Sequence, residues 1–410
     1  MSLNSLVSAV VGEPTYARVS GVKTVSRSGL STIASREQPT HASNEVYTVV
    51  QPTSSPSASL FINNPSASGS YTDFLIPNLQ NKVQDINLCI ALKNTSGVSC
   101  NYSGFHILNR VEYYSGSTLV CNLTPDFLLH RHWLLNPDCL VTAQSPMNNV
   151  IVGFIKPTLA ESVDNLIIRV TGPFQHIVPD LLKEQLRIRL FWAAEDTLAA
   201  NTGLVVTTPP TLLIESTGLS PTDNNTISSL YNSSLYRHRF TEPRVITETR
   251  FLTNSQNMTI SLSNLNGIYS AFLVYAVKKA DKNALASGRY ENVFNKIWIT
   301  NAEGAILQGG SELTVDQHQY MLSSMIPNAI LATNMGKCVV PLVFTHNFHS
   351  DLGTGSCHGV QPLYSQGETL HLVVRRDAVT SLPAEEYNIH VMGIHMSAYR
   401  IQDGRLISMR

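Results

Sequence analysis

The chain has 410 residues, 43% hydrophobic and 14% charged, which is enough for two globular cores and excludes a small disulfide-stapled module. Its 28 basic and 29 acidic side chains give a formal net charge of −1, so no global field holds nucleic acid or an anionic membrane over the whole surface. The charged fraction is well below the roughly 25% of ordinary soluble domains, while Ser, Thr and Asn are plentiful. This composition favours a β-rich assembly component over a solvated enzyme.

Targeting and redox signals are weak. No stretch approaches the roughly 20 apolar residues of a membrane helix, and residues 1–12 lack the regions of a signal peptide, so we expect synthesis in the cytosol. The six cysteines have no C-x-x-C spacing, which predicts buried thiols rather than disulfides. They are Cys89, Cys100, Cys121, Cys139, Cys338 and Cys357.

Residues 1–44 are rich in Ser, Thr, Val and Gly without sustained periodicity, which predicts a flexible N-terminal arm. Two interpretations stay open, a disordered leader and an extended basic arm that orders against a neighbour, a membrane face or packaged nucleic acid. The charges that support the second are Arg18, Lys23, Arg27 and Arg36.

From Val46 onward, short segments alternate apolar and polar residues and are separated by Pro, Gly, Asn and Ser clusters, which is typical of half-buried strands. The clearest is 86–92, where Ile86, Leu88 and Ile90 share one face. Similar alternation occurs at 166–170, 186–190, 258–262 and 370–374.

Helices are few. The best candidate is 124–135, with Thr124 as cap, Pro125 at the first position and Asp126 in the first turn. Others are expected after Thr314, ending before Pro327, and at 223–231.

The chain also contains an internal duplication. The segment 108–113, its turn at Ser115-Gly116 and a following helix signal recur at 294–299, shifted by 186 residues at the shared Asn109 and Asn295. Segment 164–170 is echoed by 367–374 with a shift of 204, which suggests a longer insertion in the second copy. We therefore expect two β units of like topology, at 45–200 and 218–410, joined by a linker at 201–217.

Units of this length, all-β with long loops and one loop helix, suit a jelly roll better than a shorter immunoglobulin sandwich or a propeller with a short repeat. The predicted fold class is all-β, with two eight-stranded jelly-roll sandwiches in tandem and a few short loop helices.

The strand at 83–93, the 105–113 strand with its Gly116 turn, and the helix after Thr124 resemble the first half of double jelly-roll major capsid proteins. These proteins form the shells of tailless icosahedral DNA viruses of the adenovirus and tectivirus lineage. Segments from Met258 through 295–297 and 341–345 to 370–374 resemble the second roll, so the likeness covers roughly residues 45–400.

The resemblance implies a non-enzymatic structural protein of the virion capsid, without cofactor, whose trimers are pseudo-hexameric capsomers. Its implied partners are copies of itself, penton and minor capsid proteins, and an internal membrane or the genome reached by the termini. If both termini point inward, the C-terminal Arg400, Arg405 and Arg410 add positive charge to an inner face together with the basic arm.

Candidate chemistry is sparse. The densest set of possible metal ligands is His346, His349, Asp351 and His358, but His346 and His349 point to opposite faces of a strand, so only a loop could join them at one ion. His130 and His132 diverge on a helix. The sequence contains no Gly-x-Ser-x-Gly elbow and no Walker-type loop.

Two rival functions remain from the sequence. One is a two-domain β-sandwich adhesin or spike that binds a glycan through its loops, and the other is a two-domain cupin-like metalloenzyme. Exposed aromatic loops would favour the first, and stoichiometric metal would favour the second.

Overall fold

The computed structural model describes residues 45–53, 70–95, 100–135, 150–151, 155–158, 163–198, 203–233, 236–252, 256–265, 267–306, 311–323, 338–345, 370–376 and 385–408. The predicted arm at 1–44, with its basic residues Arg18, Lys23, Arg27 and Arg36, lies outside the described residues. So do Arg410 and the candidate metal ligands His346, His349, Asp351 and His358.

The first half of the chain is built from short strands with one substantial helix. Its elements are β1 (Glu45–Val50), β2 (Tyr71–Leu75), β3 (Lys82–Asn94), β4 (Cys100–Ser103), η2 (Gly104–Ile107), β5 (Leu108–Ser115), β6 (Thr118–Leu123), α3 (Pro125–Leu135), β7 (Val150–Ile151), β8 (Ile155–Thr158), β9 (Val163–Arg169), η3 (Gly172–Phe174), η4 (Pro179–Leu181), β10 (Leu186–Trp192), α5 (Glu195–Leu198) and β11 (Leu204–Thr217).

The second half repeats this plan after a second helix. Its elements are α6 (Pro221–Asn232), β12 (Tyr236–Leu252), β13 (Gln256–Ser261), β14 (Tyr269–Lys278), β15 (Lys296–Thr300), β16 (Leu313–Thr314), α7 (Val315–Ser323), β17 (Val340–Val343), β18 (His371–Arg376), β19 (Glu385–Gln402) and β20 (Arg405–Ser408). The three predicted helices are confirmed as α3, α6 and α7.

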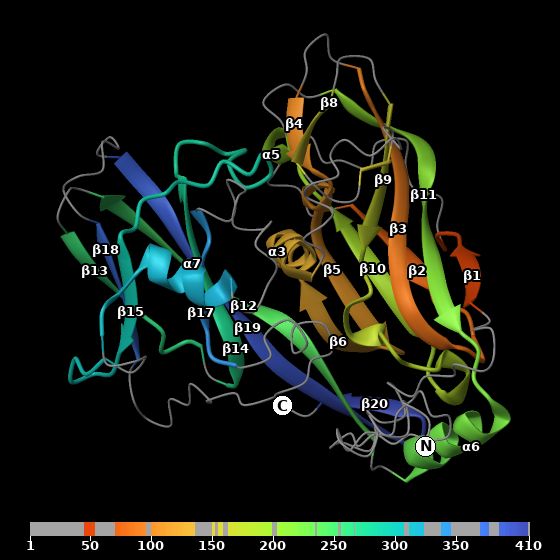
Figure 1. Ribbon diagram of the computed structural model, residues 1–410. Helices are drawn as coiled ribbons and strands as arrows, with labels where there is room; N and C mark the ends of the chain where they lie inside the picture. The colour runs from red at the N-terminus through yellow and green to blue at the C-terminus, as the bar shows by residue number, and fades with distance from the viewer. Residues whose placement is uncertain are drawn as a thin grey trace, which may run out of the picture.

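The strands form two sandwiches of two sheets each (Figure 1). In the first sandwich the large sheet has the order β1-β11-β3-β9-β7 and the small sheet β2-β10-β5-β6. In the second, the large sheet has the order β12-β19-β14-β17, with β20 on β19, and the small sheet β13-β18-β15-β16. In this order, β1, β11, β3 and β9 of the first large sheet match β12, β19, β14 and β17 of the second. The small sheets match in the same way. The predicted all-β fold with two like units is confirmed.

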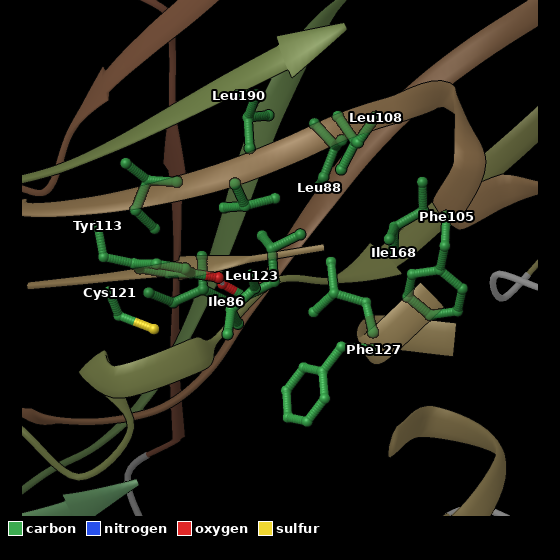
Figure 2. Close-up of a cluster of buried hydrophobic side chains, with 14 of the residues drawn as sticks. Ile86, Leu88, Phe105, Leu108, Tyr113, Cys121, Leu123, Phe127, Ile168 and Leu190 are labelled. Carbon is green, nitrogen blue, oxygen red and sulfur yellow. Dashed lines mark hydrogen bonds between the residues drawn. The ribbon is translucent and has the colours of Figure 1, made fainter. Parts of the chain in front are cut away.

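Side-chain alternation explains why these segments pair as they do. On β10, Leu186, Ile188 and Leu190 are buried while Arg187 and Arg189 point outward. Since successive side chains on a strand face opposite ways, one face of each strand joins a core. Figure 2 shows this core in the first sandwich, where Ile86 and Leu88 of β3 gather with side chains from other strands.

That core does not stop at the first sandwich. It continues through Phe127 and Trp133 of α3 to Leu273 and Tyr275 of β14 and Met392 of β19. A separate core lies inside the second sandwich, around Phe272 and Val274 on the other face of β14. The large sheet of the second sandwich is therefore buried on both faces, and α3 lies between the two sandwiches (Figure 1).

Two expectations about organisation were wrong. The expected linker at 201–217 holds β11, which pairs with both β1 and β3 inside the first sandwich. Its Thr207-Thr208-Pro209-Pro210 run has the composition of a linker, but Leu212 and Ile214 are fully buried and hold the segment in the sheet. The element between β11 and β12 is instead α6.

The second echo within the duplication was shifted by one strand. By sheet position β9 matches β17, β10 matches β18 and β11 matches β19, whereas the sequence comparison placed β9 on β18. The sequence offset between the first residues of β10 and β18, Leu186 and His371, is then close to the offset between β5 and β15. The longer insertion inferred for the second copy is therefore also wrong. Alternating apolar strands look alike in sequence, and only their pairing partners distinguish them.

Candidate functional site

The predicted basic residues that the structure describes, Arg400 and Arg405, lie on the β19–β20 hairpin. Its turn, Asp403-Gly404, has positive φ at both positions (52° and 72°), as a tight two-residue hairpin requires. Arg405 lies opposite Gln402, and Arg400 lies two residues further along, so both arginines are on one face of the hairpin. Arg400 is exposed and Arg405 is 66% exposed, with Glu184 Oε1 at 3.7 Å from its Nε.

Two further arginines join this face, and the sequence analysis missed them. Arg237 and Arg239 of β12 pair in register with Arg400 and Ala398 of β19, and both are exposed. The alternating Arg237-His238-Arg239 pattern was a local signal for two cations on one side of a strand, but only strand pairing across the second half of the chain shows what they join. Arg237, Arg239, Arg400 and Arg405 are called the basic face below.

The basic face lies at the end of the molecule where the described chain begins and ends. Glu45, the first residue of β1, pairs with Thr217, which is followed by α6. The hairpin reaches the same region, because the backbone N–H of Lys183 donates to the carbonyl of Gly404 at 2.8 Å. In Figure 1, α6 and β20 are at the lower end of the view.

A cluster of buried polar groups lies where α3 meets the second sandwich. Asp126 Oδ1 is 2.8 Å from His106 Nε2, and His130 Nδ1 donates to the carbonyl of Asp126 at 2.7 Å. The His130 ring lies 4.9 Å from that of Tyr275, and the His390 ring lies 5.0 Å from the same tyrosine ring. We call this set the seam cluster.

The environment of the seam cluster keeps His130 and His390 neutral and the Asp126 carboxyl ionised. Burial lowers the pKa of His130 to about 4, against the opposing attraction of Asp126, and it also lowers the pKa of His390. Burial by itself would raise the pKa of Asp126, but the hydrogen bond and charge of His106 outweigh it and lower that pKa. The histidines and Tyr275 are 0 to 8% exposed and Asp126 is 19% exposed, so the cluster packs the two sandwiches together and offers little access to a substrate.

A serine, a histidine and a glutamate also meet on neighbouring strands of the second sandwich. Ser397 Oγ donates to Glu242 Oε1 at 2.8 Å, and His395 Nδ1 lies 3.1 Å from the first and 3.2 Å from the second. A hydrolase triad needs the serine and the carboxylate on different ring nitrogens. Here both meet Nδ1, so the arrangement cannot relay a proton to an attacking hydroxyl.

These contacts stabilise the ionised carboxylate of Glu242 instead. Burial opposes its ionisation, but hydrogen bonds from His395 and Ser397 and the charge of Arg244 lower its pKa to about 2. Glu242 therefore stays ionised and paired.

Other candidate chemistry is not supported in the part of the chain that the structure describes. No group of three or more His, Cys, Asp or Glu side chains there could hold a metal ion. His130 and His132 do diverge, since His130 faces Tyr275 while His132 packs on Phe105 at 5.5 Å. No described helix is long and apolar enough to cross a membrane.

The remaining features of the site region are cysteine side chains and a small cavity. Cys121 and Cys338 are buried and form no disulfide, as expected, whereas Cys89 is partly exposed on the outside of β3. A cavity of about 20 Å³ between the sandwiches, lined by Phe127, His176 and His238 among others, has room for about one water molecule. It is far smaller than a ligand site of roughly 300 Å³ or more.

Comparison with known proteins identifies the architecture. Neither a protein-family model nor a curated protein sequence matches this chain. Among solved structures it is similar to the PBCV-1 virus capsid, at 11% identity and a TM-score of 0.60 over 95% of this chain and 99% of that one. It is also similar to the Faustovirus major capsid protein, at 10% identity and a TM-score of 0.61 over 99% and 97%. The chain is a double jelly roll.

A third similar structure, of the Sputnik virophage, extends the double jelly-roll match at 10% identity, with a TM-score of 0.52 over 97% of this chain and 95% of that one. Each of these three matches spans nearly the whole of both chains, so the likeness covers both rolls.

Proposed function

We propose that this double jelly roll is a major capsid protein, a non-enzymatic structural protein of the virion that assembles as pseudo-hexameric trimers into an icosahedral shell. The observation that carries the proposal is the alignment of nearly the whole chain, both rolls together, with the PBCV-1 capsid and the Faustovirus major capsid protein. Two like rolls in one chain supply two of six equal positions, so three copies complete a hexagonal outline.

The surface chemistry supports assembly. Only 14% of the residues are charged, so flanks can become buried between copies with few ionised groups to desolvate. The most exposed large hydrophobic side chains in the described residues are on strands and a helix, among them Tyr47, Phe251, Tyr71 and Tyr320. A glycan-binding spike would carry such aromatics on loops, which this part of the chain does not.

The solution mass tests the proposal. Light scattering on the purified 45.0 kDa chain, with negative-stain images of the same sample, should give a trimer with a hexagonal outline. Metal analysis of that sample should find no stoichiometric metal. A stable monomer or dimer would overturn the capsid proposal, and a metal-bearing one would favour the cupin-like alternative.

We further propose that the basic face points toward the inside of the shell and contacts phosphate groups of an internal membrane or of the genome. The start of β1 and the β19–β20 hairpin lie at the same end of the molecule, which supports this proposal. The basic arm at 1–44 would then emerge beside Arg400 and Arg405. Penton and minor capsid proteins are the further partners that the resemblance implies.

Binding assays test this orientation. Arg400→Glu with Arg405→Glu should weaken binding to anionic vesicles or to duplex DNA at low salt, and the tighter of the two ligands indicates which inner layer is met. Arg250→Glu, near the far end of β12 and 48% exposed, is the matched control. Equal binding by all three proteins, or unchanged assembly and inner-layer attachment after trimming residues 1–40, would contradict the proposal.

A further inference from the structure

The helices α3 and α7 occupy equivalent positions in the two rolls. Each directly follows the last strand of its small sheet, β6 or β16. Each is capped by a threonine: the N–H of Phe127 donates to Thr124 Oγ1 at 3.4 Å, and that of Gln317 donates to Thr314 Oγ1 at 3.2 Å. An aspartate follows two residues after each cap. This alignment matches Asp126 with Asp316 and His130 with Tyr320.

The surroundings of the two helices differ completely. His130 is 0% exposed and its ring contacts Tyr275 of the other roll at 4.9 Å. Its counterpart Tyr320 is 78% exposed, and Asp316 is exposed as well. Helix α7 packs on β16 and β17 of its own roll, where His318 Nε2 donates to the carbonyl of Ile297 at 2.7 Å. Figure 1 shows α3 between the rolls and α7 beside the second roll.

The surface that receives α3 also has a counterpart. Within the chain, α3 packs on the outer face of the β12-β19-β14-β17 sheet, through Leu273, Tyr275 and Met392. The equivalent sheet of the first roll is β1-β11-β3-β9. Its outer face carries Tyr47 at 58% and Val49 at 59% exposure, and beside them the half-buried Leu213, Cys89 and Ile167.

This outer face has the chemistry of a contact that forms after folding. Val49 lies opposite Leu213, and Thr211 lies opposite Cys89, so the part of the face around Val49 is uncharged. Tyr47 lies opposite Glu215, and Glu215 lies opposite Asp85, so the other end of the face is charged. Contiguous exposed apolar side chains on a monomer mark interaction sites, and tyrosine is among the residues that contribute most to protein interfaces. The apolar part of the sheet face around Val49 and an exposed tyrosine-bearing helix are therefore complementary.

We propose that α7 of one copy docks on the outer face of the β1-β11-β3-β9 sheet of a second copy, with Tyr320 as its anchor. This contact repeats between chains the one that α3 makes within the chain, and the inference rests on the proposed capsid function. Because one surface meets a different surface, the contact is head-to-tail, and such contacts close into a ring when each step turns by the same angle.

The test uses substitutions on both sides of the contact in the full chain. Tyr320→Ala on α7 and Val49→Asp on β1 should each raise the concentration at which half of the protein is trimeric by about tenfold or more. Tyr320→Phe should retain trimers. Tyr71→Ala is the control, because Tyr71 is 51% exposed but lies on the small sheet of the first roll. Circular dichroism confirms that each variant is folded.

The outcomes separate this inference from the function on which it rests. If the wild type is trimeric and both Tyr320→Ala and Val49→Asp stay as trimeric as the wild type, the docking surface is wrong while the capsid function stands. An equal loss with Tyr71→Ala would also overturn it. A wild type that is monomeric at every concentration would instead overturn the capsid function.

Discussion

The rings of His130 and Tyr275 lie 4.9 Å apart although the first belongs to α3 of the first roll and the second to β14 of the second. Both side chains are fully buried. The two rolls therefore share one core, and their relative position is set by packing rather than by a tether. In the proposed trimer each chain presents two equivalent positions to a ring, and a fixed relative position of the two rolls suits that role.

The first prediction concerns pH. Burial holds the pKa of His130 at about 4 and that of His238 at about 3, against 6.5 for a free histidine. Between these values the unfolded chain binds protons that the folded chain does not, so stability falls as the pH falls from about 6.5 to 4. For His130 this loss is on the order of 3 kcal/mol.

Melting temperatures from pH 7.5 to 4.5 measure this effect. The groups that face His130 are Asp126, His106 and His390, and Asp126 has a lowered pKa, so its own contribution is lost only at more acidic pH. His130→Gln should show a shallower fall than the wild type, and His371→Gln, on β18 away from the seam, should not. A melting temperature that does not change over this range would contradict the prediction.

The second prediction compares two buried tyrosines at the seam. The Tyr399 hydroxyl donates to the carbonyl of Pro173 in the first roll at 2.8 Å. Tyr399→Phe leaves that carbonyl unpaired and should cost about 1–2 kcal/mol of unfolding free energy. The Tyr275 hydroxyl is buried without a hydrogen-bond partner among the described residues, so Tyr275→Phe should be neutral or stabilising. Urea titrations measure the unfolding free energy of both variants. Equal losses in the two variants would contradict this prediction.

The third prediction concerns two glycines with positive φ. At Gly172 (51°) an added Cβ would lie 2.5 Å from the ring of Tyr113, whereas at Gly304 (83°) it would meet nothing within 4 Å. Gly304→Ala should therefore cost only the backbone strain, about 1 kcal/mol. Gly172→Ala adds a steric clash in a close-packed core and should cost at least about 2 kcal/mol more. Thermal unfolding distinguishes them, and similar losses at both sites would exclude the clash.

The fourth prediction concerns the outer face of the small sheet of the first roll. Arg189 donates two hydrogen bonds to Asp73, at 2.7 and 2.8 Å, and its guanidinium stacks 4.1 Å from the centre of the Tyr71 ring. Lysine can reproduce neither the paired hydrogen bonds nor the planar stacking. Arg189→Lys should therefore cost about 1 kcal/mol in denaturant titrations, while Arg250→Lys, at an exposed pair, should have no measurable effect.

Much of this fold was predictable from the sequence, because local spacing decides which side chains can share a face. Period-two alternation predicted the strands, the Thr124 cap predicted α3, and the repeat around Asn109 and Asn295 predicted two like units. The segment after Thr314 predicted α7. At the candidate site, Arg400 and Arg405 could be chosen as cations near one end of the chain. Their shared face follows from a hairpin whose turn residues are local.

Only the tertiary structure decided which strands became neighbours. It made β11 a sheet strand instead of a linker, matched β10 with β18, and brought Arg237 beside Arg400. It also buried His130 while leaving Tyr320 at 78% exposure, although the two helices begin alike. The physical reason is that alternation and caps are set by residues a few positions apart, whereas burial of a face depends on partners more than a hundred residues away, or in another copy of the chain.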